Sequence, residues 1–187
     1  REMPIYLAAF GPQMSRAAGR LTDGVLINMA NPGEVRRIVG EVRSGAGEVG
    51  KDPESLEIIC KIRCCLAPTY ERAREALGGV LTYYALADYY RDLLTRMGFG
   101  TEVEAMRAAW QASGFQAARA LISDRLFEGL PVVAATSAEV IWAKIKQYQE
   151  AGVTRVILPY VPASEDVAGE VREFISAAGR LIAGKTT

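Results

Sequence analysis

Segments with the length and composition of β-strands alternate along this chain of 187 residues with segments of helical periodicity. The strand-like segments lie near residues 4–9, 25–28, 56–67 and 154–161, and a predicted helix follows each of them. Strict β-then-α order is typical of parallel sheets, because parallel strands need a long crossover that a helix usually supplies. The order therefore predicts an α/β protein, either a doubly wound sheet or a (β/α)8 barrel.

The first 28 residues form the shortest of these units. An apolar strand runs into the tight turn Gly11-Pro12, and a short helix then leads directly to the second strand. So short a unit predicts two parallel, neighbouring strands joined by a right-handed crossover. Proline suits the first position of a helix, so a helix N-terminus is expected at the carboxyl end of the first strand. Its unpaired N–H groups attract anions, which predicts a phosphate site, although such a turn can also be purely structural.

Composition excludes several classes of function. The 22 basic and 22 acidic side chains balance, which gives no footprint for nucleic acid or for an anionic membrane. No apolar run approaches the roughly 20 residues that a membrane span needs, and no signal-peptide pattern is visible, so we expect a cytoplasmic protein. The chain has no histidine, which excludes imidazole as its general base or metal ligand. Cys60, Cys64 and Cys65 lack a C-x-x-C spacing and are expected to be buried thiols.

Polar residues occupy one face of the third strand segment. Glu57, Lys61 and Arg63 share that face with Ile59 and Cys65, whereas the opposite face is apolar. This pattern fits the lumen of a barrel, where polar side chains near strand ends point at a ligand. An edge strand with a solvated face explains it equally well. Arg63 is a candidate contact for an anionic substrate or cofactor tail, with a surface salt bridge as the alternative.

Helix signals fill most of the remaining chain. Asn31-Pro32-Gly33-Glu34 predicts a capped helix start, and Gly45, Gly47 and Gly50 predict the end of that helix. Residues 131–135 are a short apolar segment, and a capping box at residues 136–139 predicts a helix through Glu150. Residues 70–130 predict a helical insertion after the third strand. Its four tyrosines are expected to be packing residues rather than cofactor stackers; they are Tyr83, Tyr84, Tyr89 and Tyr90.

Three segments together carry a resemblance to a known family. They are residues 4–12 with their continuation to residue 28, Gly50-Lys51-Asp52-Pro53 before the third strand, and residues 151–159. They resemble the carboxyl-terminal half of the bacterial luciferase-like monooxygenase family. The resemblance is strongest to its coenzyme F420-dependent oxidoreductase branch, which includes 5,10-methylenetetrahydromethanopterin reductase.

This resemblance implies a (β/α)8 TIM barrel in which the chain supplies strands five to eight as a single half-barrel domain over residues 1–187. Members bind a deazaflavin or FMN at the carboxyl-terminal mouth and pass hydride between it and a substrate. Coenzyme F420 is therefore the expected cofactor, with FMN as the alternative. The residues that match the family's cofactor-binding segments are Ala8, Ala9, Phe10, Gly11, Pro12, Gln13, Ile27 and Asn28. Since no basic residue follows Gly11-Pro12 until Arg16, backbone dipoles are expected to hold the phosphate tail.

Four β/α units make half a barrel, with open strand edges and an apolar lumen face that invite association. We therefore expect a homo-oligomer or association with a preceding amino-terminal half. The sequence begins at Arg1 and is interpreted as a piece of a longer enzyme, inactive by itself. The alternatives are an FMN-dependent monooxygenase, a non-catalytic half-barrel that self-associates, and a phosphosugar-binding α/β domain with another chemistry.

Overall fold

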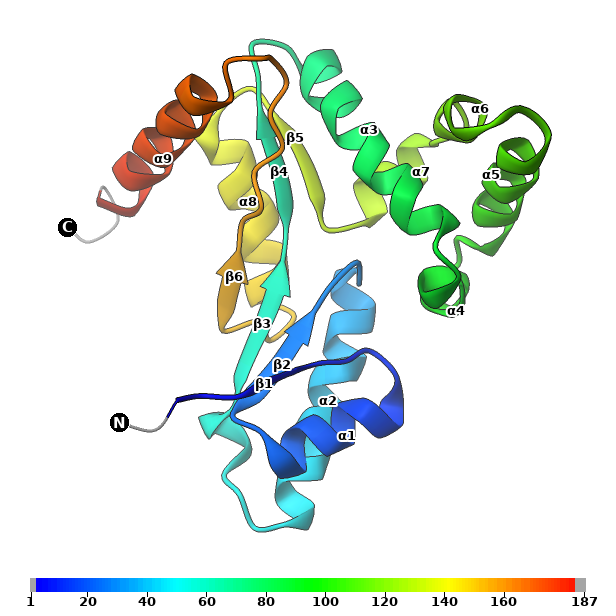
Figure 1. Ribbon diagram of the computed structural model, residues 1–187. Coiled ribbons are helices and arrows are strands. Elements are labelled where there is room, and N and C mark those ends of the chain that lie inside the picture. The colour runs from blue at the N-terminus through cyan, green and yellow to red at the C-terminus, as the bar shows by residue number, and fades with distance from the viewer. Residues whose placement is uncertain (1–2, 184–187) are drawn as a thin grey trace. The chain divides into compact units, whose positions relative to one another are not determined.

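The chain folds into two compact units in a computed structural model that describes residues 3–183 (Figure 1). The first unit contains the residues up to Ile62 together with Lys146–Ile157. The second unit contains Arg63–Ile145 together with the residues from Leu158 onward. Within the described residues, no helix is both long enough and apolar enough to cross a membrane.

A parallel four-stranded sheet is the centre of the first unit. Its strands are β1 (Tyr6–Ala8), β2 (Gly24–Ile27), β3 (Glu57–Lys61) and β6 (Arg155–Ile157), in the order β1-β2-β3-β6. Every pairing is parallel, which confirms the predicted pairing of the first two strands. The sheet places β3 between β2 and β6, so the edge-strand explanation of its polar face is wrong.

Helices α1 (Pro12–Leu21) and α2 (Pro32–Glu48) and the short 3₁₀ helix η1 (Pro53–Ser55) complete the first unit. The start of α2 is as predicted, because the side chain of Asn31 accepts a hydrogen bond from the amide of Glu34 at 2.8 Å. The prediction that Gly45 and Gly47 end this helix is wrong, since both lie inside α2. Gly45 instead permits close packing of α1: a Cβ atom there would lie 2.1 Å from the backbone oxygen of Arg16.

The second unit contains the parallel pair β4 (Arg63–Leu66) and β5 (Val132–Ala135). The strand predicted over residues 56–67 is therefore two strands, which separate at Ile62 because β3 pairs with β2 and β6 whereas β4 pairs with β5. The apolar segment before residue 136, not counted as a strand in the sequence, is the fully buried β5. The strand predicted over residues 154–161 is also shorter: β6 ends at Ile157, and only an isolated bridge joins Tyr160 to Cys64.

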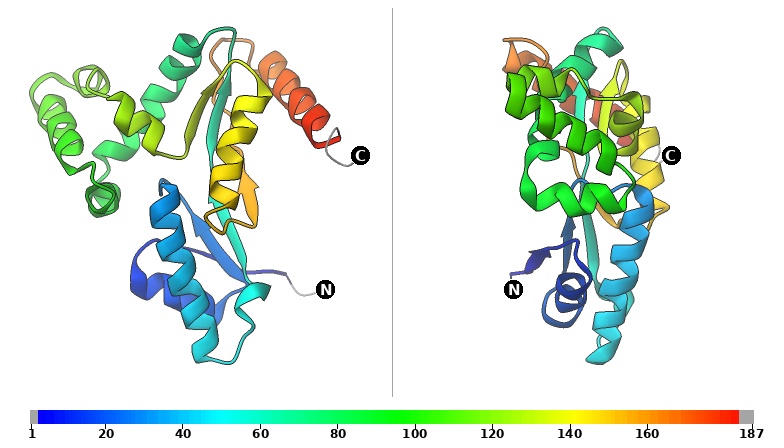
Figure 2. Two further views of the ribbon diagram at one scale, coloured as in Figure 1. Left: turned by 180° about the vertical axis from the view of Figure 1, so that it is seen from behind. Right: turned by 90° about the vertical axis from the view of Figure 1, so that its right-hand side faces the viewer.

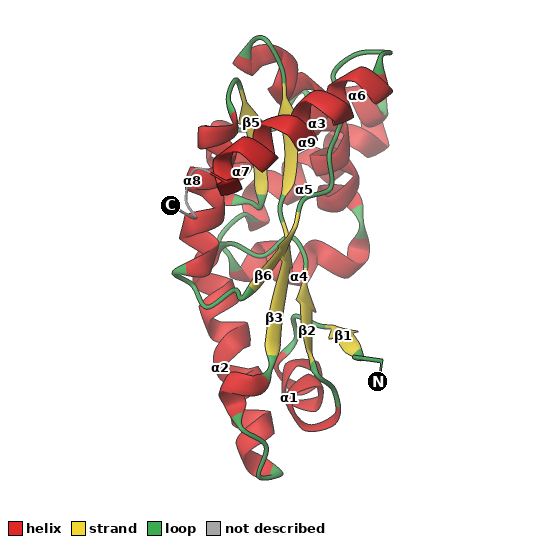
Figure 3. Ribbon diagram, turned by 90° about the vertical axis from the view of Figure 1, so that its left-hand side faces the viewer, coloured by secondary structure: helices red, strands yellow, loops and turns green. Residues whose placement is uncertain are grey.

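Helices make up most of the rest of the second unit (Figures 1 and 2). They are α3 (Tyr70–Leu86), α4 (Asp88–Arg96), α5 (Gly100–Ser113), α6 (Phe115–Arg119), α7 (Asp124–Gly129), α8 (Ala138–Gln149) and α9 (Val167–Ala183). Residues 70–130 contain α3 to α7 and no strand, as Figure 3 shows, so their predicted helical character is confirmed. Helix α8 begins in this unit, and its residues from Lys146 belong to the first unit.

Each unit has its own apolar core. Fully buried side chains include Val25, Ile27 and Ile38 in the first unit and Leu77 and Leu93 in the second. All three cysteine thiols are buried, as expected. The four tyrosines of α3 and α4 make edge-to-face contacts, although two of them remain largely exposed.

Candidate functional site

The turn between β1 and α1 keeps the predicted phosphate-binding residues together at the carboxyl end of β1. Ala8 ends the strand and is exposed, and the buried Ala9 donates its amide to the Leu26 carbonyl at 3.3 Å. Gly11 is the N-cap of α1 in an extended conformation, with φ −78° and ψ 150°. Pro12 and the exposed Gln13 then form the start of the helix.

The N-terminus of α1 has no side-chain cap. The first helical bond joins the Ser15 amide to the Gly11 carbonyl at 2.9 Å, so the amides of Gln13 and Met14 precede the helical ladder. Both of these residues are exposed, and the first turn contains no acidic side chain. A Cβ atom added to Gly11 would have no neighbour within 4 Å. The positive end of the helix dipole therefore faces open space, which suits an anion.

The end of β2 borders this turn. Ala8 pairs in register with Leu26, so Ile27 and Asn28 follow at the same edge of the sheet. The side chain of Ile27 is fully buried and that of Asn28 is half-buried. Met29, with φ 57°, is the only residue other than glycine with a positive φ in the described part of the chain. Strained backbone of this kind often accompanies functional sites, because packing must hold it in place.

Arg37 is a cation at this turn that the sequence analysis missed. Its guanidinium donates to the Phe10 carbonyl at 2.6 Å and to the Glu34 carboxylate at 2.7 and 3.0 Å. The hydrogen bond to Glu34 raises the pKa of Arg37. The predicted pairing of the first two strands already placed the helices that follow them side by side. A search for cations could therefore have included the early turns of α2.

Arg63 lies in the second unit, unlike the other candidate residues. Its side chain is only 8% exposed, so it is not the surface residue of the salt-bridge alternative. The guanidinium donates to the Tyr84 hydroxyl, and its central carbon lies 4.5 Å from the centre of the Tyr84 ring.

Neither Cys64 nor Cys65 offers a nucleophile. Burial raises the pKa of Cys64 to about 12 and that of Cys65 to about 11, so both thiols stay protonated near neutral pH. Within residues 3–183, no cluster of three or more potential metal-ligating side chains is present.

Comparisons of sequence show the family of the chain. The luciferase-like monooxygenase family matches residues 1–155 of the chain. The 5,10-methylenetetrahydromethanopterin reductase of Methanopyrus kandleri is 27% identical over 158 residues, which cover 84% of this chain and 44% of the relative. The reductase of the same name from Archaeoglobus fulgidus is 23% identical over 188 residues, 98% of this chain and 54% of the relative. The chain thus spans about half the length of the curated relatives it matches.

Solved structures agree on the fold. The coenzyme F420-dependent tetrahydromethanopterin reductase of Methanopyrus kandleri matches with a TM-score of 0.75 and 26% identity, over 90% of this chain and 48% of that chain. An F420-dependent secondary alcohol dehydrogenase in complex with an F420-acetone adduct matches with a TM-score of 0.66 and 24% identity, over 96% of this chain and 49% of that chain. Riboflavin lyase with modified FMN matches with a TM-score of 0.61 and 19% identity, over 97% of this chain and 43% of that chain. The dehydrogenase and the lyase are both less than 25% identical to this chain, so their similarity shows the fold alone.

The family match covers most of the chain, and the parallel sheet and its helices agree with the luciferase-like α/β fold of the structural neighbours. This chain belongs to the luciferase-like monooxygenase family.

Proposed function

We propose that the chain is part of a coenzyme F420-dependent oxidoreductase that transfers hydride between the deazaflavin and a small organic substrate. The observation that carries the anionic cofactor in this proposal is the uncapped N-terminus of α1, open at Gly11, at the carboxyl end of β1. The choice of F420 rests on the relatives. Support comes from relatives named as methylenetetrahydromethanopterin reductases and from the structure of an F420-dependent reductase.

The residues of the β1–α1 turn fit an anionic cofactor tail. The small side chain of Ala8 and the lack of one at Gly11 leave the backbone accessible, and the amides of Gln13 and Met14 lie outside the helical ladder. Arg37 holds the turn through the Phe10 carbonyl, while the Glu34 carboxylate balances its charge. When bound, the deazaflavin supplies the hydride chemistry, and the protein supplies binding and orientation.

The roles of the remaining candidates follow from their places in the fold. We propose that Ala9, Pro12, Ile27 and Asn28 shape the border of the tail site. Ile27 would do so through its backbone, because its side chain is buried. Arg63 is proposed as a contact for an anionic group, with Tyr84 holding its guanidinium in place.

We further propose that residues 1–187 form one half-barrel domain, strands five to eight of a (β/α)8 barrel, with residues 70–130 as an insertion. The chain has about half the length of its relatives, and β1 and β6 are the edge strands of the first unit's sheet. A preceding amino-terminal half or a second copy would complete the barrel, so this chain alone would be inactive. The cytoplasmic location expected from the sequence is also part of the proposal.

The main alternative is an FMN-dependent monooxygenase of the same fold. The α1 N-terminus itself favours neither cofactor, because its amides would meet the phosphate of FMN as readily as that of F420.

Titration of the complete natural protein with each cofactor tests the assignment. We expect saturable binding of F420, with FMN at least about tenfold weaker, a difference of about 1.4 kcal/mol. Binding can be followed by the change in cofactor fluorescence, with heat-unfolded protein as the control. Saturable binding of FMN alone would overturn the F420 assignment, and binding of neither would overturn the cofactor site.

A further inference from the structure

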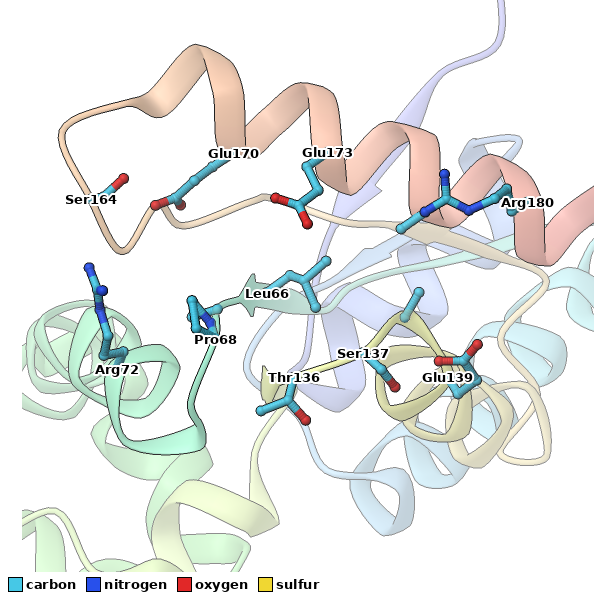
Figure 4. A pocket seen from close by; sticks show the side chains of 13 residues that line it. Leu66, Pro68, Arg72, Thr136, Ser137, Glu139, Ser164, Glu170, Glu173 and Arg180 are labelled. Atoms are coloured by element: carbon cyan, nitrogen blue, oxygen red, sulfur yellow. The ribbon is translucent and has the colours of Figure 1, made fainter.

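A cavity of about 760 Å³ lies within the second unit, at the carboxyl ends of β4 and β5 (Figure 4). Residues from β4, from the start of α8, from α3 and from α9 line it. Its volume is typical of sites for small molecules. None of the candidate cofactor residues of the β1–α1 turn lines it.

One wall of the cavity is fixed by Glu170. Its carboxylate accepts hydrogen bonds from the Ala163 amide at 2.9 Å and from the Tyr160 hydroxyl at 3.1 Å. Burial opposes ionisation of Glu170, but these bonds and those from the side chain and the backbone of Ser164 outweigh it and lower the pKa of the carboxyl group. Glu170 is therefore an ionised part of the wall whose hydrogen bonds are already made.

A second acidic group of the lining is also engaged. Ser137 donates a hydrogen bond to the carboxylate of Glu139, and the positive charge of Arg180 lies close enough to act on it. Both interactions lower the pKa of Glu139. The negative charge of Glu139 and the positive charge of Arg180 therefore compensate each other at this end of the cavity.

Two opposite charges of the lining remain available. The guanidinium of Arg72 has five N–H donors, and its one side-chain contact within the described residues is a long 3.5 Å bond to the Ala163 carbonyl. Within residues 3–183, the carboxylate of Glu173 forms no hydrogen bond or ion pair. Figure 4 shows Arg72 entering from α3 and Glu173 from α9, with Pro68 and Leu66 drawn between them.

We propose that this cavity binds an aliphatic zwitterion, with its carboxylate at Arg72 and its ammonium at Glu173. The methylene chain would cover Leu66 and Pro68, whose apolar surface separates the two charges. The lining carries three carboxylates and two guanidinium groups, which disfavours a dianion. A simple amine would leave Arg72 without a partner.

Calorimetric titration of the complete natural protein with 6-aminohexanoate tests the proposal. We expect saturable binding, with hexanoate and hexylamine each at least tenfold weaker because each lacks one of the two charges. Arg72→Gln and Glu173→Gln should each weaken the binding of 6-aminohexanoate about tenfold. For each variant, the affinity for the single-charge analogue that does not meet the changed residue should stay constant.

Arg91→Gln and Glu104→Gln are matched controls, because they remove one charge of each sign from an exposed ion pair outside the cavity. These controls should bind 6-aminohexanoate like the unaltered protein. Circular dichroism would check that all four variants fold. The proposal is overturned if 6-aminohexanoate does not bind saturably. It is also overturned if hexanoate or hexylamine binds equally well, or if the cavity variants bind like the controls.

Discussion

At the scale of single residues, the first unit depends on two glycines that let α1 and α2 meet backbone to backbone. A Cβ atom on Gly19 would lie 2.0 Å from the Val42 carbonyl oxygen, and one on Gly45 would lie 2.1 Å from that of Arg16. Both distances are far below van der Waals contact, and the opposing atoms belong to the backbone, which cannot rotate away. Any larger residue must push the two helices apart.

Gly45→Ala should therefore destabilise the protein by about 1–3 kcal/mol, the usual cost of overpacking. Gly47→Ala is the matched control in the same helix, because its added methyl group has no neighbour within 4 Å. That control should stabilise the helix by about 0.5–1 kcal/mol, since alanine loses less conformational entropy than glycine. Urea unfolding followed by circular dichroism measures both changes, and equal stabilisation of the two variants would contradict the close packing.

The same residues show why the sequence alone could not assign a structural role to every glycine. Gly45 and Gly47 read alike as helix-ending residues, yet one permits a helix contact and the other faces open space. Only the partner helix distinguishes them. Arg37 was missed for the same reason, because it reaches the Phe10 carbonyl from 27 positions away.

At the scale of elements, Glu170 ties α9 to the loop before it. Its carboxylate accepts the Ala163 amide and the Tyr160 hydroxyl, and the Tyr160 ring stacks on Phe174 at 4.9 Å between ring centres. Because the folded state lowers the pKa of Glu170, ionisation of this group stabilises the fold above its unfolded pKa. That contribution is lost as the pH falls through the lowered folded value.

Glu170→Gln should therefore flatten the loss of stability between about pH 5 and pH 3, while lowering stability at neutral pH. Glu165→Gln is the control, because that exposed side chain has no hydrogen bond or ion pair within the described residues. Trp110 and Trp142, the only tryptophans of the chain, both lie in the second unit, so their fluorescence reports its unfolding directly. A pH profile unchanged by Glu170→Gln would show that this carboxylate does not carry the effect.

Elements defined by local signals were predicted well, and elements defined by distant partners were not. The Asn31 cap and the proline start of α1 depend on adjacent residues, and both are confirmed. The short β5 is a strand only because β4 lies beside it, and the separation of β3 from β4 at Ile62 reflects a change of partner strand. Ile62 itself gives no signal of that change in the sequence.

At the scale of the whole molecule, the order of strands and helices predicted the α/β class, and three segments, the β1–α1 unit among them, together carried the family resemblance. The family is confirmed, and the α1 N-terminus lies where the sequence placed it. The half-barrel and the choice of cofactor stay proposals, because the chain spans about half the length of the curated relatives it matches and the α1 N-terminus would suit the phosphate of F420 or of FMN.

The affinity of the full-length protein for F420, compared between the unaltered protein and its Gly11→Asp variant, tests whether the anionic tail of the cofactor binds at the α1 N-terminus. Asp is a good N-cap, and the extended backbone at Gly11 accepts a side chain, so the variant should keep or slightly raise thermal stability. Its carboxylate would compete for the amides of the α1 N-terminus and repel an anionic tail. We predict at least a tenfold loss of F420 affinity, whereas Gly11→Ala, which adds a methyl group without charge, should lose far less. Unchanged F420 affinity in Gly11→Asp would show that the cofactor's anionic tail does not bind at this turn.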